Sequence, residues 1–343
     1  IDGGEYNVAI GNKSLGANTS GDYNVAVGWS SMDDNTTGAA NTSVGYLTLG
    51  ANTTGSYNNA IGYGALNSNT TGGYNTGSGS NVLQNNTTGS HNVASGTYAL
   101  YRNTTGAQNT AVGRSALMDN TTGSDNTAVG MNALERNTTA DGNTAVGNYA
   151  LIQNTIGNSN TAVGSNTLEN NTIGDANTAM GNSALNSNTE GNYNTALGNY
   201  TLNANTTASG NTAVGFYALM QNTIGNSNTA VGKDAMLLNT EGLLNTAVGH
   251  QALNKNTTGN NNTVVGINSM LDNTTGIQNS AFGTDALPRN TTGGYNTALG
   301  GYALTTSTTA SYNTAVGWGS LYANTTGTRN IAMGYRALDG PDT

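Results

Sequence analysis

The chain has 343 residues, only 8% of them charged, and a formal net charge of −9 at pH 7. It lacks cysteine and any basic cluster, which excludes disulfides, thiolate metal sites and an electrostatic nucleic-acid surface. No apolar run is long enough to cross a bilayer, so we expect no membrane insertion.

One short unit repeats along the whole sequence. Asn stands at position 7 and at every seventeenth residue through Asn330, giving twenty copies of roughly N-T-A-V-G-x-x-A-L-x-x-N-T-T-G-x-x. A short fixed period without insertions is typical of a solenoid of stacked coils. We predict an all-β parallel β-solenoid (β-roll or β-helix) of about twenty 17-residue coils, forming one elongated domain over residues 1–343 within a longer protein or fibre. Rungs about 4.8 Å apart would make a rod about 95 Å long.

The first predicted element of each unit is a strand that begins after the lead Asn, which we number 0. β-Branched residues recur at +1 and +3 around a small residue, usually Ala, at +2. Because strand side chains alternate between two faces, we expect +1 and +3 to point inward and +2 outward. Gly at +4 (Gly11, Gly28, Gly113) marks a corner that needs positive φ or has no room for Cβ. The lead asparagines are predicted to form an amide ladder along the rod (Asn7, Asn24, Asn109, Asn126, Asn330).

The second half of each unit contains Leu or Met at +8 and an N-T-T segment at +11 to +13. Leu117 and Leu134 illustrate the inward anchor at +8. Position +13 accepts Glu190 and Glu241, so it faces water, and Thr at +12 (Thr121) is then expected to point inward and bond to backbone through its hydroxyl. Asn at +11 predicts a second amide ladder. Each coil should therefore consist of short strands joined by tight turns, with two or three sheets in total.

The N-T-A-V-G motif, followed by x-x-A-L and a glycine turn, resembles the head repeats of trimeric autotransporter adhesins. It is also similar to N-T-A-V-G-x-x-A-L-x-x-N-T-T-G arrays in tail-fibre-like proteins of phages and bacteria. The resemblance covers all twenty copies and implies a left-handed β-roll that associates as a trimer on a cell or virion surface. The unit here is longer than the usual adhesin repeat, and residues 1–343 do not contain the pattern of a coiled-coil stalk or a membrane anchor.

The small residue at +2 has two interpretations. A column of Ala would provide a smooth face for close packing between copies of the chain, as a trimer requires. Alternatively, the column faces solvent on a flat sheet. The sequence does not separate these hypotheses.

No residues recur in a pattern that indicates catalysis. His91 and His250 stand far apart at variable corners, without carboxylates at metal-ligand spacing. The stretch Gly77-Ser78-Gly79 imitates the start of a dinucleotide-binding loop but falls inside the repeat and is not followed by a helical pattern. We therefore predict no enzymatic activity, catalytic residues, cofactor or metal.

Two surface features suggest sugars. Tyr and Trp gather at corner positions, where rings would either stack on a host glycan or stack on each other between coils. The N-T-T segment also matches the N-glycosylation pattern. The pattern is lost in some copies where Asn persists, which favours a structural role for the Asn. The candidate acceptors are Asn35, Asn52, Asn69, Asn103, Asn120, Asn137, Asn205, Asn256, Asn273, Asn290 and Asn324.

These patterns together predict a structural fibre segment, adhesin-like or tail-fibre-like, that is extracellular or on a cell or virion surface. Its expected partner is itself, as a head-to-tail filament or a homotrimer, with cell-surface or extracellular glycans as further candidates. Alternatives are a glycosylated filament and a carbohydrate- or ice-binding module. Ice binding needs two outward ranks of Thr, whereas two of the three Thr positions are predicted to point inward.

Overall fold

A computed structural model describes residues 4–340, which form twenty three-residue strands and no helix. The fold is the predicted all-β parallel β-solenoid. The described residues fall into two compact units, one ending at Ile173 and one beginning at Gly174. Residues 1–3 and 341–343 of the predicted 1–343 domain lie outside the described part.

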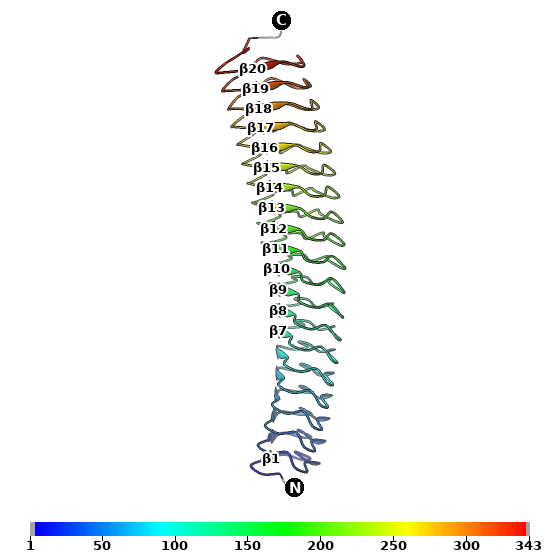
Figure 1. The fold of residues 1–343 in the computed structure, drawn as a ribbon. Coiled ribbons are helices and arrows are strands. Elements are labelled where there is room, and N and C mark those ends of the chain that lie inside the picture. Colours follow the sequence, from blue (N-terminus) through cyan, green and yellow to red (C-terminus); the bar gives the residue numbers. More distant parts are fainter. Residues whose placement is uncertain (1–3, 341–343) are drawn as a thin grey trace. The chain divides into compact units, whose positions relative to one another are not determined.

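The first unit contains ten strands, one per coil (Figure 1). Each pairs in parallel with the next in a 17-residue register, so that Val8 lies opposite Val25. The strands are β1 (Val8–Ile10), β2 (Val25–Val27), β3 (Thr42–Val44), β4 (Asn59–Ile61), β5 (Thr76–Ser78), β6 (Val93–Ser95), β7 (Thr110–Val112), β8 (Thr127–Val129), β9 (Thr144–Val146) and β10 (Thr161–Val163).

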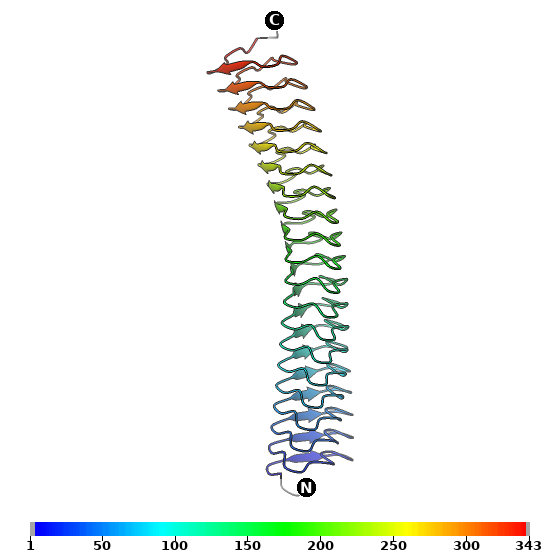
Figure 2. The same ribbon diagram turned by 45° about the vertical axis from the view of Figure 1, so that its right-hand side comes forward.

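The second unit repeats this arrangement with ten further strands. Thr178 lies opposite Thr195, and its strands stack on one side of the unit (Figure 2). The strands are β11 (Thr178–Met180), β12 (Thr195–Leu197), β13 (Thr212–Val214), β14 (Thr229–Val231), β15 (Thr246–Val248), β16 (Thr263–Val265), β17 (Ser280–Phe282), β18 (Thr297–Leu299), β19 (Thr314–Val316) and β20 (Ile331–Met333).

The faces of the strands are the reverse of the prediction. Side chains do alternate, but +2 points into the coil: Ala111 and Ala213 are completely buried. The residues at +1 and +3 point outward, and Val112 is 40% exposed. The physical reason is space, because a Cβ at +2 is already in contact with the side chains at +7 and +8: at Gly77 it would lie 3.1 Å from Val82 and 3.5 Å from Leu66. The two hypotheses for the Ala column, a face between copies and a face toward solvent, are therefore both wrong.

The core of each coil is small and partly polar. It contains the +2 residue, Leu or Met at +8, usually another small residue at +7, and the two asparagines at 0 and +11. Leu117 and Leu134 are completely buried, as predicted for the +8 anchor. Since most coils bury only one large apolar side chain, a single coil cannot offset the entropy of ordering seventeen residues, and stability must come from stacking.

Each coil contains one strand, so the prediction of two or three sheets is wrong. The rest of the coil is made of turns in which +6, +8 and +16 adopt left-handed backbone, as at Ser115, Leu117 and Asp125, with φ of 57°, 51° and 59°. These residues break the extended geometry that a second strand would need. The N-T-T segment still pairs between coils: the backbone N–H and hydroxyl of Thr121 both donate to the Thr138 carbonyl, at 2.9 and 3.0 Å.

The corner at +4 follows the prediction. Gly113 has φ of 132°, and a Cβ there would collide with the carbonyl group of Gly130 in the next coil. The same holds for Gly11 against Gly28. Glycine at +4 is therefore required both by the backbone conformation and by the close approach of successive coils.

Candidate functional site

The asparagines at +11 form a buried ladder. The side-chain Nδ2 of Asn120 donates to Oδ1 of Asn103 in the preceding coil, at 2.8 Å, and to the carbonyl of Gly123, at 2.9 Å. The Nδ2 of Asn109, the lead residue of the same coil, donates to this carbonyl too, at 2.8 Å. Two amides from two corners thus hold one carbonyl group, and this clamp ties the ends of the coil together.

The lead asparagines form the second predicted ladder, in a different way. The backbone N–H of Asn126 donates to Oδ1 of Asn109, at 3.0 Å. The same bond joins Asn24 to Asn7 at 2.8 Å and Asn330 to Asn313 at 2.9 Å. Because a buried polar group without a partner is costly, these bonds explain why a core can be lined with amides.

The structure does not support glycosylation of the candidate acceptors in the folded chain. Their side chains are at most 2% exposed. Ten of them use both Nδ2 hydrogens, and a glycan would displace one of these hydrogen bonds and force a sugar into the core. Asn324 donates only to Gly327, at 3.0 Å. The residues concerned are Asn35, Asn52, Asn69, Asn103, Asn120, Asn137, Asn205, Asn256, Asn273, Asn290 and Asn324.

Thr121 lies differently from its prediction. Its hydroxyl bonds to backbone as expected, but the side chain is half-buried rather than part of the core, and the neighbouring Thr122 is exposed. The +12 column therefore lies at the boundary between the core and water. Its hydroxyl reinforces the backbone pairing between coils.

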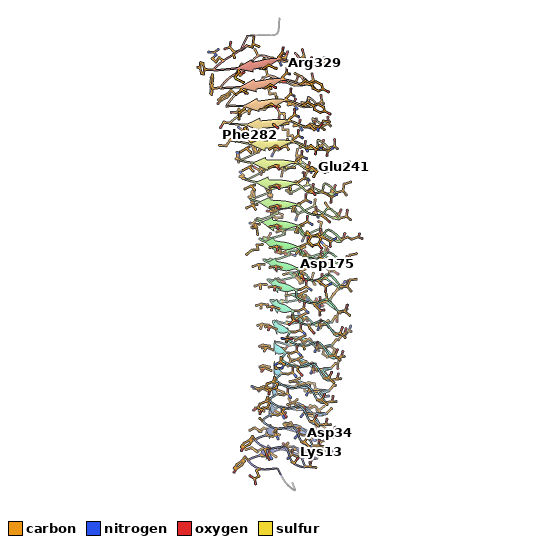
Figure 3. The ribbon with its side chains drawn as sticks, viewed as in Figure 1. Lys13, Asp34, Asp175, Glu241, Phe282 and Arg329 are labelled. Atoms are coloured by element: carbon orange, nitrogen blue, oxygen red, sulfur yellow. The ribbon has the colours of Figure 1, made fainter. Side chains whose placement is uncertain are left out.

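The outward side chains at +1 and +3 form a surface that we call the T-A-V face. In both units it consists of half-buried to exposed side chains, most often Thr at +1 and aliphatic at +3; Met180 and Leu299 are 45% and 48% exposed. None of the twenty copies has a charged residue at either position. In the second unit, Phe282 of this face and Glu241 at +13 point outward on opposite sides (Figure 3).

Sequence reasoning missed this face, although a signal was present. Position +2 accepts only Ala, Ser43, Gly77 and Val264, whereas +3 accepts residues from Ser78 to Phe282. Tolerance of very different sizes is expected of an outward position, since a close-packed interior resists changes in volume. The β-branched character of +1 and +3 reflects a strand surface, not its burial.

The exposed aromatic rings stack on each other between coils. In the +16 column, Tyr57 stacks on Tyr74, and Tyr74 on His91, with centroids 4.8 and 4.9 Å apart. Trp29 stacks on Tyr46 in the +5 column, at 4.9 Å. A ring placed between two others has both faces covered, which leaves only its edge for a sugar.

A shallow hollow of about 380 Å³ lies beside Trp29 in the first unit. Its lining includes Gly50, Ala51, Lys13, Asp33, Asp34 and Asn67. The Lys13 Nζ is 4.0 Å from the Asp33 carboxylate. This is a depression of mixed polar and apolar lining that is open to water, rather than a preorganised binding site.

Charges lie at the corners, and some of them pair between coils. Lys255 contacts Asp272 at 2.9 Å, and Arg102 contacts Asp119 at 3.2 Å. Exposed pairs of this kind contribute little to stability. Within residues 4–340, no three His, Cys, Asp or Glu side chains gather where a metal ion could bind. The same residues form no helix that is long and apolar enough to cross a membrane.

No family model and no curated protein matches this chain.

Proposed function

We propose that the chain is a structural, repetitive segment of an extracellular or virion-surface fibre, in which copies pack side by side through their T-A-V faces. The observation that carries this proposal is the face itself. The solvent-facing side of a sheet normally carries charged or strongly polar side chains. The T-A-V face has no charged residue in any copy, and about half of its side chains are aliphatic. Extended uncharged apolar surface is typical of an interface.

A second copy of the chain fits this surface best. Both copies would have the same spacing between coils, so aliphatic side chains of one meet those of the other at every rung. With Val112 40% exposed, one coil offers on the order of 80 Å² from +1 and +3 together. Ten coils then offer on the order of 800 Å² per copy, the size of a standard stable interface.

The resemblance to surface adhesins and tail fibres supports the location, and it favours three copies around a common axis. Sugar binding through a tyrosine platform is less favoured, since stacked rings cover each other. Ice binding is less favoured as well: Thr at +1 does face outward, contrary to the prediction, but its neighbouring rank at +3 is mainly aliphatic rather than Thr.

Light scattering after size exclusion tests the assembly. We expect the chain to elute as a small oligomer, and V112E/V129E, with charges on adjacent rungs of the face, to be monomeric because burying unpaired carboxylates is costly. The matched control is T105E/T122E, which places the same charges at +13, where Glu190 and Glu241 occur naturally.

The outcomes separate the alternatives. The control should remain oligomeric, and circular dichroism should show that both variants fold. A monomeric natural chain, or equal assembly of the two variants, would overturn side-by-side packing. Masses that grow with concentration alike in both variants would instead indicate head-to-tail association.

A further inference from the structure

The +11 ladder has one interruption. In the first nineteen copies of the repeat this position is Asn, except for Ser307. The side chain of Ser307 is completely buried, and its hydroxyl oxygen has no hydrogen-bond partner. A shorter polar side chain therefore stands at a core position that is built for a carboxamide.

The missing carboxamide leaves its neighbours with unused hydrogen-bonding capacity. In the preceding coil, the Oδ1 of Asn290 is buried without a partner. The carbonyl of Ala310 receives one side-chain amide, from Asn296 at 2.8 Å, instead of the usual two. In the following coil, Asn324 Nδ2 donates to the Gly327 carbonyl at 3.0 Å. Its second hydrogen has no Asn Oδ1 to bind in the preceding coil, because Ser307 stands there.

We propose that one buried water molecule binds at Ser307 and takes the place of the missing carboxamide. Its two hydrogens would be donated to Asn290 Oδ1 and the Ala310 carbonyl, the bonds that an Asn Nδ2 makes elsewhere in the column. One of its lone pairs would accept from Asn324 Nδ2, replacing the Asn Oδ1. The Ser307 hydroxyl completes a tetrahedral set of partners.

Size and polarity both agree with a water molecule. Replacing Asn with Ser removes about 25 Å³ of side chain, close to the volume of about 30 Å³ that one water occupies in the liquid. Buried waters typically make about three hydrogen bonds to groups that lack other partners, and this site offers four. An apolar occupant would leave all four groups unpaired.

High-resolution structures of the natural chain, S307N and N256S test the proposal. The natural chain should show an ordered water within hydrogen-bond distance of Asn290 Oδ1, the Ala310 carbonyl and Asn324 Nδ2. In S307N, the new carboxamide should occupy that place. N256S copies the interruption into an intact part of the ladder, where Asn256 bonds to Asn239 and Gly259, at 2.7 and 2.9 Å.

N256S should therefore gain an equivalent water between Asn239 Oδ1, the Gly259 carbonyl and Asn273 Nδ2. Thermal unfolding supplies a second readout. S307N should raise the midpoint, because the new carboxamide makes these hydrogen bonds itself and no water molecule has to be immobilised. N256S should lower the midpoint for the opposite reason. A dry gap, or a Ser307 hydroxyl that turns to donate directly to Asn290 Oδ1, would overturn the proposal. Failure of the fibre hypothesis would leave it unaffected, because none of these atoms lies on the T-A-V face.

Discussion

At the scale of single residues, the structure depends on the size of the side chains inside the coil and on left-handed backbone conformations at its corners. Leu117 combines both demands: it fills the core while its backbone is left-handed, with φ of 51°. This conformation costs an ordinary residue roughly 1–2 kcal/mol. Since the cost recurs at +6, +8 and +16 of most coils, packing and the hydrogen bonds between coils must offset it.

The narrow interior leads to a prediction at two adjacent residues of β13. We expect A213L to lower the free energy of unfolding by about 1–3 kcal/mol or more, because extra methylenes are forced into a packed core. V214L should change it by less than about 0.5 kcal/mol, as expected of an outward site. Leu197 and Leu299 already occupy equivalent +3 positions.

Urea unfolding of the two variants measures the difference. Equal destabilisation by A213L and V214L would contradict the assignment of +2 to the core.

At the scale of the element, the amide columns are as important as the strands. Each three-residue strand is short, and the bond from one asparagine to the next extends the connection between coils around the rest of the perimeter. The clamp on the Gly123 carbonyl shows why Asn is needed at both 0 and +11: each position must donate from the side chain and also accept. Neither Asp nor Ser does both equally well.

Replacing Asn120 with Asp tests this requirement. The ionised side chain cannot donate, so Asn103 Oδ1 and one clamp bond to Gly123 lose their donor, and a buried charge is added. We expect N120D to lose about 3–5 kcal/mol of stability at pH 7. N120S retains a neutral donor and should lose less.

The effect of N120D should depend on pH. Burial raises the pKa of the new carboxyl in the folded state above its unfolded value of about 3.9. The variant should therefore be closest to the natural chain below pH 3.9, where the acid is protonated in both states and can donate. Its relative stability should fall as pH rises toward the folded pKa. Unfolding at several pH values measures this, and a constant difference would contradict a buried carboxylate.

The sequence predicted the period, the solenoid, both asparagine ladders and the +4 corner, because each depends on a residue repeated at one position. It did not predict which strand face is buried. Alternation at +1 to +3 is compatible with +2 pointing inward or with +1 and +3 pointing inward. Only the space available inside the coil decides between these two arrangements. The left-handed conformations at +6, +8 and +16 were also missed, since residue types such as Tyr217 and Leu219 rarely adopt positive φ and so give no signal of it in a sequence. The T-A-V face was missed for the same reason, because +1 and +3 were assigned to the interior.

At the scale of the whole molecule, stability should be approximately a sum over coils and their contacts. Deletion of residues 211–227 in the second unit removes one complete coil and joins Gly210 to Asn228 in phase. We expect this variant to fold with a slightly lower melting temperature. Deletion of residues 211–226 leaves Ser227 as an extra residue in one coil, which should interrupt both amide columns and lower the melting temperature further.

Thermal melts followed by circular dichroism compare the two deletions. If the 16-residue deletion were tolerated as well as the 17-residue deletion, contacts between coils would not depend on a fixed period.

The one-way donation along the +11 column gives each unit a polarity. In every bonded pair the N–H points toward the preceding coil and the oxygen toward the following one, as from Asn52 to Asn35 and from Asn273 to Asn256. The side-chain dipoles therefore add, as peptide dipoles do along a helix. A coil that joins such a column must place its carboxamide N–H groups against the oxygens of the neighbouring coil. An inverted coil would place N–H against N–H or oxygen against oxygen. The carboxamides thus make stacking directional as well as strong.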